Sequence, residues 1–406
     1  MRVVPISCLR PAPEHAGRFA APPYDVFDNE QARAYVQAHP KSFLDVDRPE
    51  TAFAPDYDMY APEVYAHAAD VVAQRVADGT LVQDDGPCLY VYRLAQGGHA
   101  QVGVMGAVSV DEYLDGTIKR HEQVREEKVA DRVRHIEALQ AQTGPVLVTY
   151  RDDTVVDAKV ARVCADEPLY DFVDYAGVRH SFWRVAGAEA EELVRAFAHV
   201  HQGYIADGHH RGAASCRICQ EARAAGEDVG IRDSFLAVIF PASRMQVLAY
   251  NRVVADTNGL AETELVAALE AAGIVVGERQ QRAVLPGAHR TVGMYAFGAW
   301  RALRLPEPAA DVAPRDLLDV SILQDLVLAP VLGIDDPTAD ARISFVSGAE
   351  GSEALERLAG AEGVAFAMHP TSVADLMAVS DADELMPPKS TWFAPKPASG
   401  LVIRQI

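Results

Sequence analysis

The chain has 406 residues, of which 49% are hydrophobic and 23% are charged, a balance that predicts a globular protein of two or three packed domains. Acidic residues outnumber Lys and Arg by 58 to 37, and the net charge of −21 disfavours binding to nucleic acid and to anionic lipid. No apolar run is long enough to cross a membrane and the first residues lack the apolar core of a secretory signal, so we expect a cytoplasmic protein.

The first half of the chain alternates short helical and strand patterns with proline-rich turns. Residues 60–78 have the pattern of an amphipathic helix. Two runs with strand character, 89–92 and the Val-rich 101–110, flank a Gly-Gly turn and predict a β-hairpin. A long helix is expected over 122–141, and a buried strand over 146–150.

The second half continues with a helix over 187–200, a strand at 204–206 and a helix that runs from the following turn to about 225. Strands are expected over 235–240 and 245–254, and a smaller α/β unit begins beyond 256. In that unit we expect helices at 261–272, 316–328 and 371–380, a strand pair at 291–297 and 299–305, a loop at 386–397 and a last strand at 401–403. The pattern predicts a mixed α/β (α+β) fold with a core at 1–255, a smaller α/β domain at 256–380, and a C-terminal loop and strand at 381–406 that returns to the core.

The first cluster of reactive residues is Asp207-Gly208-His209-His210-Arg211, at the predicted junction of a strand and a helix. The free N–H groups of a helix start, two imidazoles and a guanidinium all favour an anion, and phosphate above all. Asp207 would cap the helix, orient an imidazole or bind Mg²⁺. The alternative is a capped helix with surface histidines, but the density of titratable groups favours a functional site.

The second cluster, Lys119-Arg120-His121-Glu122-Gln123, leads into the predicted helix over 122–141. Along it Arg125, Lys128, Arg132 and His135 recur every three or four residues, which places them on one face. Such a stripe is either a phosphate-binding face or a solvated face balanced by neighbouring acids, and the pattern does not separate the two. Glu122, beside Lys119, Arg120 and His121, is a candidate general base, and the alternative is an ordinary acidic residue at a helix start.

Three further segments are ambiguous by pattern alone. Pro387 to Lys396 is a rigid loop in which Lys389, Ser390 and Thr391 can hold phosphate oxygens, although the glycine-rich P-loop of nucleotide-binding proteins is missing. For the turn Pro22-Pro23-Tyr24-Asp25 the pattern favours a purely structural role over binding, and the pair Asn251-Arg252 suits either role.

The five cysteines are scattered and odd in number, which indicates reduced thiols. Cys216 and Cys219 have the spacing of a zinc or redox pair, but no second pair completes a site and both fall in a predicted helix. Packing of two small apolar side chains is the preferred interpretation.

Taken in order, these motifs resemble the signature of a bacterial family of pyrophosphate-dependent serine kinases that was long catalogued as a domain of unknown function. The likeness runs from near residue 1 to the end, and Met386-Pro387-Pro388-Lys389-Ser390-Thr391 is a particularly specific part of it. The resemblance implies that the substrates are L-serine and pyrophosphate, that the products are O-phosphoserine and phosphate, and that Mg²⁺ is the cofactor. It also implies a role in serine and cysteine metabolism.

Two motifs are also similar to those of the archaeal ADP-dependent free serine kinase, which has a fold like ParB and sulfiredoxin. This resemblance implies a ParB/sulfiredoxin-like catalytic core in which Glu122 accepts the serine hydroxyl proton and Asp207 positions that hydroxyl or the metal ion. The cysteine that sulfiredoxin carries in its equivalent turn is missing, which argues against peroxiredoxin repair. The expected substrate- and phosphate-binding residues are Tyr24, Asp25, Lys119, Arg120, His121, Arg125, Arg132, His209, His210, Arg211, Asn251, Arg252, Lys389, Ser390 and Thr391.

The residue pattern leaves several functions open. A serine kinase could use pyrophosphate, ADP or ATP, since no residue identifies a base or proves its absence. A ParB-like nucleotide- or DNA-binding module is disfavoured by the net charge of −21 and by the lack of a basic helix-turn-helix segment. A phosphate sensor without turnover is the third possibility. The acceptor, the oligomeric state and the physiological direction are not determined by the pattern.

Overall fold

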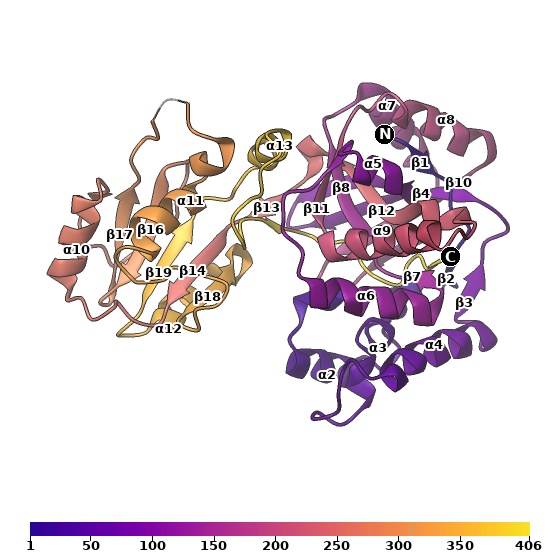
Figure 1. Ribbon diagram of the computed structural model, residues 1–406, viewed down its shortest axis with the longest axis horizontal. Coiled ribbons are helices and arrows are strands. Elements are labelled where there is room, and N and C mark those ends of the chain that lie inside the picture. Colours follow the sequence, from indigo (N-terminus) through magenta and orange to yellow (C-terminus); the bar gives the residue numbers. More distant parts are fainter. Residues whose placement is uncertain (310) are drawn as a thin grey trace. The chain divides into compact units, whose positions relative to one another are not determined.

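A computed structural model describes residues 1–309 and 311–406 (Figure 1). The chain forms two compact units, the first from Met1–Gln246 with Pro395–Ile406 and the second from Val247–Ala394. Each unit combines helices with a β-sheet, so the predicted mixed α/β class is confirmed. The predicted boundary at 255 differs because Tyr250–Val254 pairs with two strands of the second unit. The predicted boundary at 380 differs because Trp392–Phe393 pairs with Val247–Leu248 of the same unit.

The first unit is built on a nine-stranded sheet in the order β6-β11-β8-β12-β5-β4-β10-β9, with β1 beside β5. Two neighbouring pairs, β6 with β11 and β8 with β12, are parallel, and the others are antiparallel. The strands are β1 (Val3–Val4), β4 (Cys88–Gln96), β5 (His99–Ser109), β6 (Ile118–Lys119), β8 (Val146–Tyr150), β9 (Tyr170–Val173), β10 (Arg179–Ala186), β11 (Gly203–Asp207) and β12 (Ser234–Pro241).

Buried apolar residues explain the central strands. Every residue of β12 is buried, as a strand with layers on both faces requires. The predicted hairpin is confirmed, since β4 and β5 pair across Gly97 and Gly98. Two short pairs lie outside this sheet, β2 (Leu9–Pro11) with β3 (Leu81–Gln83) and β7 (Ala141–Gln142) with β21 (Arg404–Gln405). The predicted last strand at 401–403 is wrong by a few residues, because only Ile403 forms a bridge, to Leu9.

Helices α6 and α9 lie side by side in the first unit (Figure 1) and pack through Val129, Val133, Ile136, Ala214 and Ile218. Cys216 and Cys219 are buried in the core on α9, as the packing interpretation predicts. The helices are α1 (Ala16–Phe19), α2 (Asn29–Ala38), α3 (Leu44–Asp47), α4 (Pro62–Ala77), α5 (Val110–Leu114), α6 (Glu126–Leu139), α7 (Thr154–Val163), α8 (Gly187–Phe197) and α9 (His209–Ala224), with 3-10 turns η1 (Tyr24–Val26), η2 (Pro49–Ala52), η3 (Gly230–Asp233) and η4 (Ala242–Arg244).

The second unit contains a six-stranded sheet in the order β15-β17-β16-β19-β14-β18, and a short pair formed by β13 and β20. The predicted helix over 316–328 is three short segments, η5, α11 and η6. The strands are β13 (Val247–Leu248), β14 (Tyr250–Val254), β15 (Val275–Val276), β16 (Thr291–Ala296), β17 (Ala299–Arg304), β18 (Ile343–Ser347), β19 (Val364–Met368) and β20 (Trp392–Phe393). The helical segments are α10 (Glu262–Ala271), η5 (Pro314–Leu317), α11 (Asp319–Leu323), η6 (Gln324–Leu328), η7 (Gly348–Glu350), α12 (Gly351–Ala359) and α13 (Val373–Asp381).

Throughout the described part of the chain, each helix is too short or too polar to cross a membrane.

Candidate active site

The junction between β11 and α9 is a single glycine. Strand β11 ends at Asp207, α9 begins at His209, and Gly208 has a φ of 90°, in the left-handed region that residues with a Cβ avoid. A Cβ on Gly208 would lie 2.9 Å from Nε and Nη2 of Arg211. Glycine therefore allows the Arg211 guanidinium to fold back over the turn and reach Asp207.

Replacement of Gly208 by alanine is expected to destabilise the protein by about 1–3 kcal/mol, because a Cβ is strained at this φ and also meets the guanidinium. Urea unfolding measures the loss. Gly226→Ala is the matched control, since Gly226 also has a positive φ, of 72°, but a Cβ there would meet nothing within 4 Å. Equal destabilisation of the two variants would show that the crowding by Arg211 is unimportant.

Glu122 meets the first residue of α9. Its Oε2 lies 3.2 Å from Nδ1 of His209, and its side chain is 52% exposed. The His121 ring packs edge-on against the His209 ring, with 4.4 Å between the centroids. Burial raises the pKa of the Glu122 carboxyl, but the His209 contact and the nearby histidines outweigh it and lower that pKa to about 2. Glu122 is therefore an ionised carboxylate that is open to solvent.

The two histidines of the turn hold the segment before α6. His210 Nε2 accepts a hydrogen bond from the backbone N–H of Arg125 at 3.1 Å, and His209 Nε2 accepts one from the N–H of His121 at 3.5 Å. Helix α6 begins at Glu126 and not at 122 as predicted, because the preceding backbone is bound to the first turn of α9. The two motifs thus form one structure, although His121 and His209 are 88 positions apart.

Buried His121 makes stability depend on pH. Burial, reinforced by His209, lowers the pKa of His121 to about 3, whereas an unfolded histidine titrates near pH 6.5. A depressed folded pKa gives a contribution that is complete above about pH 6.5 and is lost as the pH falls toward 3. We expect His121→Gln to reduce the stability difference between pH 7 and pH 4.5 by about 2 kcal/mol, measured by urea unfolding. A similar reduction in His199→Gln, which alters an exposed histidine, would contradict the assignment.

Asp207 is held between two cations. Its Oδ1 lies 2.7 Å from Lys396 Nζ and its Oδ2 lies 2.9 Å from Arg211 Nη2, with all three side chains at most 20% exposed. Burial raises the pKa of the Asp207 carboxyl, but the charges of Lys396 and Arg211 outweigh it and lower that pKa to about 2. Arg211 Nη1 also donates to the carbonyl of Pro145. The turn is therefore clamped by charge-assisted hydrogen bonds.

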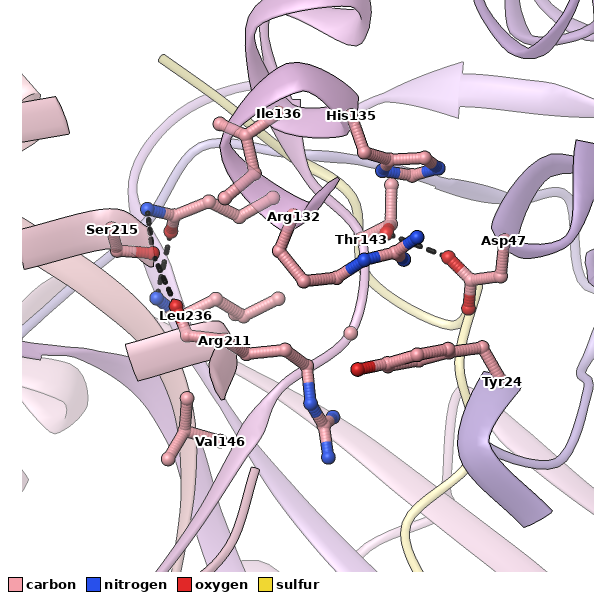
Figure 2. A pocket seen from close by; sticks show the side chains of 12 residues that line it. Tyr24, Asp47, Arg132, His135, Ile136, Thr143, Val146, Arg211, Ser215 and Leu236 are labelled. Carbon is pink, nitrogen blue, oxygen red and sulfur yellow. Dashed lines mark hydrogen bonds between the residues drawn. The ribbon is translucent and has the colours of Figure 1, made fainter. Parts of the chain in front are cut away.

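A cavity of about 20 Å³ adjoins Arg211, which is space for one water-sized molecule. Two buried polar atoms of residues at its wall, Asp47 Oδ2 and Arg211 Nε, have no hydrogen-bond partner within the described residues. Figure 2 shows the hydrogen bond from Thr143 to Asp47 and the Arg132 guanidinium near the Tyr24 ring. The hydrogen bond is 2.8 Å long, and the guanidinium lies 4.3 Å from the ring centroid. The cavity is lined by Tyr24, Asp47, Arg132, His135, Ile136, Gln142, Thr143, Gly144, Val146, Arg211, Ser215 and Leu236.

Most of the basic stripe along α6 is not a solvated face. Arg132 is buried and pairs with Asp131 at 2.7 Å, and His135 Nε2 lies 2.9 Å from the Val46 carbonyl. Lys128 Nζ reaches the Tyr60 hydroxyl at 3.4 Å. The stripe thus packs against the N-terminal segment of the first unit, and Arg125 at its start is exposed.

The remaining predicted residues of the first unit differ in accessibility. Burial raises the pKa of the Tyr24 hydroxyl to about 12, although Arg132 opposes this, so Tyr24 is a neutral packing partner. Asp25 is exposed and Lys119 is half-buried on β6. Arg120 is exposed and stacks on Tyr113, 4.9 Å from the ring centroid.

Of the predicted residues of the second unit, Arg252 is bonded to the loop that carries Lys389, Ser390 and Thr391, whereas Asn251 is bonded to the end of β19. Arg252 is buried and donates to the carbonyls of Tyr250 and, at 3.1 Å, Lys389. Ser390 donates to the Pro387 carbonyl at 2.6 Å, and Lys389 is exposed. Asn251 Oδ1 accepts from the Met368 N–H at 2.9 Å, while Thr391 is half-buried. Arg252 thus holds the Pro387–Ser390 turn in shape.

Lys396 was not among the residues singled out from the sequence. The signal was present, since Lys396 lies between two prolines of the loop that was recognised, but its partner Asp207 is 189 positions away. Asp47 was missed for the same reason, because an isolated buried carboxylate leaves no local pattern.

His121, Glu122 and His209 each offer one ligand atom within 4.8 Å of the others. Two imidazoles and a carboxylate suit first-row transition metals better than Mg²⁺, which prefers oxygen. Two carboxylates nearby could supply oxygen ligands to Mg²⁺. Both oxygens of Asp207 are already paired with cations, Arg211 and Lys396. Asp25 is close enough for its charge to raise the pKa of Lys396.

A family model described as protein of unknown function (DUF1015) matches residues 3–321. Three solved structures are similar at low identity. A free serine kinase variant in complex with AMP is 13% identical, with a TM-score of 0.35, and the match covers 71% of this chain and 87% of that one. C-terminally truncated SbnI from Staphylococcus aureus is 13% identical, with a TM-score of 0.37 and coverages of 74% and 87%. A conserved hypothetical protein from Pyrococcus furiosus is 13% identical, with a TM-score of 0.33 and coverages of 75% and 95%. No curated protein matches the chain.

Proposed function

The chain belongs to the DUF1015 family, and from this premise we propose that it is a phosphotransferase that moves a phosphoryl group from pyrophosphate to the hydroxyl of free L-serine. One observation carries the proposal. The Glu122 carboxylate and the turn Asp207–Arg211 meet through the 3.2 Å contact with His209. A proton acceptor thus lies at the N-terminus of α9, which is rich in hydrogen-bond donors, and this is the pairing that phosphoryl transfer requires.

Glu122 is the residue proposed to act on the acceptor. Its carboxylate is ionised and half-exposed, so it can accept a hydrogen bond from the serine Oγ–H and aim the oxygen at phosphorus. As the new O–P bond forms, the bond from phosphorus to the bridging oxygen breaks and phosphate leaves. The hydroxyl proton passes to Glu122. A loose transition state asks little basicity of this group, so a low pKa is compatible with the role.

Binding of the donor is assigned to the cationic side of the turn. The N–H groups at the start of α9 and the ammonium of Lys396 attract phosphate oxygens, and Arg125 supplies a further exposed charge. Burial lowers the pKa of His210, so its imidazole is neutral and binds by hydrogen bonds only. Since both terminal nitrogens of Arg211 already bind protein oxygens, its proposed part is to hold the turn and the Asp207 charge in place.

Magnesium is the cofactor implied by the family resemblance. Mg²⁺ is usually held by one or two carboxylates together with substrate phosphates, and Asp25 is an exposed carboxylate that fits this description. At Asp207 the ion would share a carboxylate with Lys396 and Arg211. We therefore assign Asp25 and Asp207 as the residues that would hold it, and its contribution when bound is to cancel charge on the transferred group.

The loop of the second unit is proposed to bind phosphate as well. The Lys389 side chain is exposed, while Arg252 holds the loop by a hydrogen bond to the Lys389 carbonyl. The loop thus presents a cation on a rigid support. Ser390 and Thr391 remain predicted phosphate-binding residues.

The direct test incubates the protein with L-serine, Mg²⁺ and, in separate reactions, pyrophosphate, ADP or ATP, and measures phosphoserine. Product with pyrophosphate supports the proposal. Product with a nucleotide alone would replace the donor and keep the acceptor, while absence of product with all three donors would overturn the kinase assignment. Stabilisation by pyrophosphate without product would indicate a phosphate-binding protein.

A further inference from the structure

Two histidines and an aspartate converge at one edge of the second unit. His289 lies two residues before the start of β16, His369 directly follows β19, and Asp319 is the first residue of α11. The first two meet because β16 and β19 are antiparallel, with Val292 opposite Met368. Each of the three residues offers a ligand atom within 4.8 Å of the others, and the two imidazole centroids are 4.6 Å apart.

The environment of these groups suits a cation. Asp319 is 6% exposed, and it is fixed by Arg290 through the backbone N–H at 3.0 Å and Nη1 at 2.7 Å. Fixed in this way, the carboxylate keeps further acceptor sites for a cation. Nδ1 of His369 is buried and has no hydrogen-bond partner within the described residues, and a buried polar atom without a partner is costly unless a ligand satisfies it.

Asp375 provides a second carboxylate close to His289. Nδ1 of His289 is 4.0 Å from Asp319 Oδ2, while Nε2 is 4.0 Å from Asp375 Oδ2. If Nδ1 binds a metal ion, Asp375 can accept the Nε2–H, and this carboxylate–histidine–metal arrangement is common at metal sites. Ligands of a tetrahedral Zn²⁺ are roughly 3.3 Å apart. His289, whose side chain is 53% exposed, has the freedom to close the remaining distance.

We propose that His289, Asp319 and His369 form a site for a divalent first-row transition metal such as Zn²⁺, with Asp375 orienting His289. Two imidazoles and one carboxylate select this class over Mg²⁺ and Ca²⁺. The ion would join the segment before β16, the start of α11 and the end of β19. The site lies wholly in the second unit and does not rest on the proposed function.

In the test, the chelator-treated full-length protein is titrated with Co²⁺, whose visible absorption bands are intense when the ion has a low coordination number. Zn²⁺ and Mg²⁺ are then added as competitors. We expect tight binding that Zn²⁺ displaces and excess Mg²⁺ does not. His289→Ala should remove one bound equivalent or weaken binding at least tenfold, and His369→Ala should do the same. His199→Ala is the matched control, because it removes one exposed histidine of the first unit.

The unfolding temperature distinguishes this site from the group His121, Glu122 and His209 in the first unit. Zn²⁺ should raise that temperature in the parent protein and in Glu122→Gln, but not in His289→Ala. Unchanged Co²⁺ stoichiometry and affinity in His289→Ala would overturn the proposal. It would also fall if Glu122→Gln or His199→Ala, and not His289→Ala, abolished binding.

Discussion

Glu122→Gln is expected to lower kcat for phosphoserine formation on the order of a hundredfold or more, while the unfolding temperature changes little. Glutamine keeps the size of the side chain and can still accept a hydrogen bond, but it cannot take the hydroxyl proton. The side chain is 52% exposed, so loss of its contact with His209 should have a small effect on stability. Initial rates with saturating serine and pyrophosphate measure the change.

Glu127→Gln is the control for this prediction. Glu127 is exposed near the start of α6, so the variant removes the same charge within a few residues of the site. A comparable loss of rate in both variants would point to the local potential and not to proton acceptance. Full activity of Glu122→Gln would refute the role of Glu122 as the base.

Lys396→Met is expected to have the second large effect, on stability and activity together. The substitution leaves Asp207, which is 19% exposed, without its closest cation, and loss of one partner of a buried pair costs on the order of 3 kcal/mol. It also removes the ammonium group that we propose to bind the phosphate oxygens of the donor. Urea unfolding measures the first effect and the KM for pyrophosphate the second.

The pH dependence of stability gives Lys396 a separate test. The folded pKa of Asp207 is depressed to about 2, so its contribution is present above about pH 4 and is lost as the pH falls from 4 toward 2. Without Lys396, the strongest cause of that depression, the folded pKa moves back toward the unfolded value, so the stability lost between pH 4 and pH 2 should be smaller. Lys396→Arg should restore most of the parent behaviour, and Lys41→Met, at an exposed lysine, should leave it unchanged. If the acid limb were the same in Lys396→Met, the ion pair would be unimportant.

Local pattern was sufficient for most elements. The β4–β5 hairpin follows from two runs of strand-forming residues around Gly97 and Gly98, and α9 follows from the glycine after β11. Both depend on neighbours in the sequence, where backbone preference and side-chain period act directly. The start of α6 was missed because it depends on His210, a residue of another helix that binds the Arg125 N–H.

The sequence by itself determined that the chain is a mixed α/β protein, that Asp207–Arg211 forms a turn at a helix start, and that Glu122 belongs to a basic, histidine-containing segment. Only the tertiary structure decided what these residues contact. It placed His209 against Glu122, paired Asp207 with Lys396, packed Arg132 on Tyr24 and gathered His289, Asp319 and His369 at one sheet edge. The physical reason is that charge and hydrogen-bond partners are chosen by distance in the folded chain, and strand register brings together residues whose separation along the sequence carries no signal.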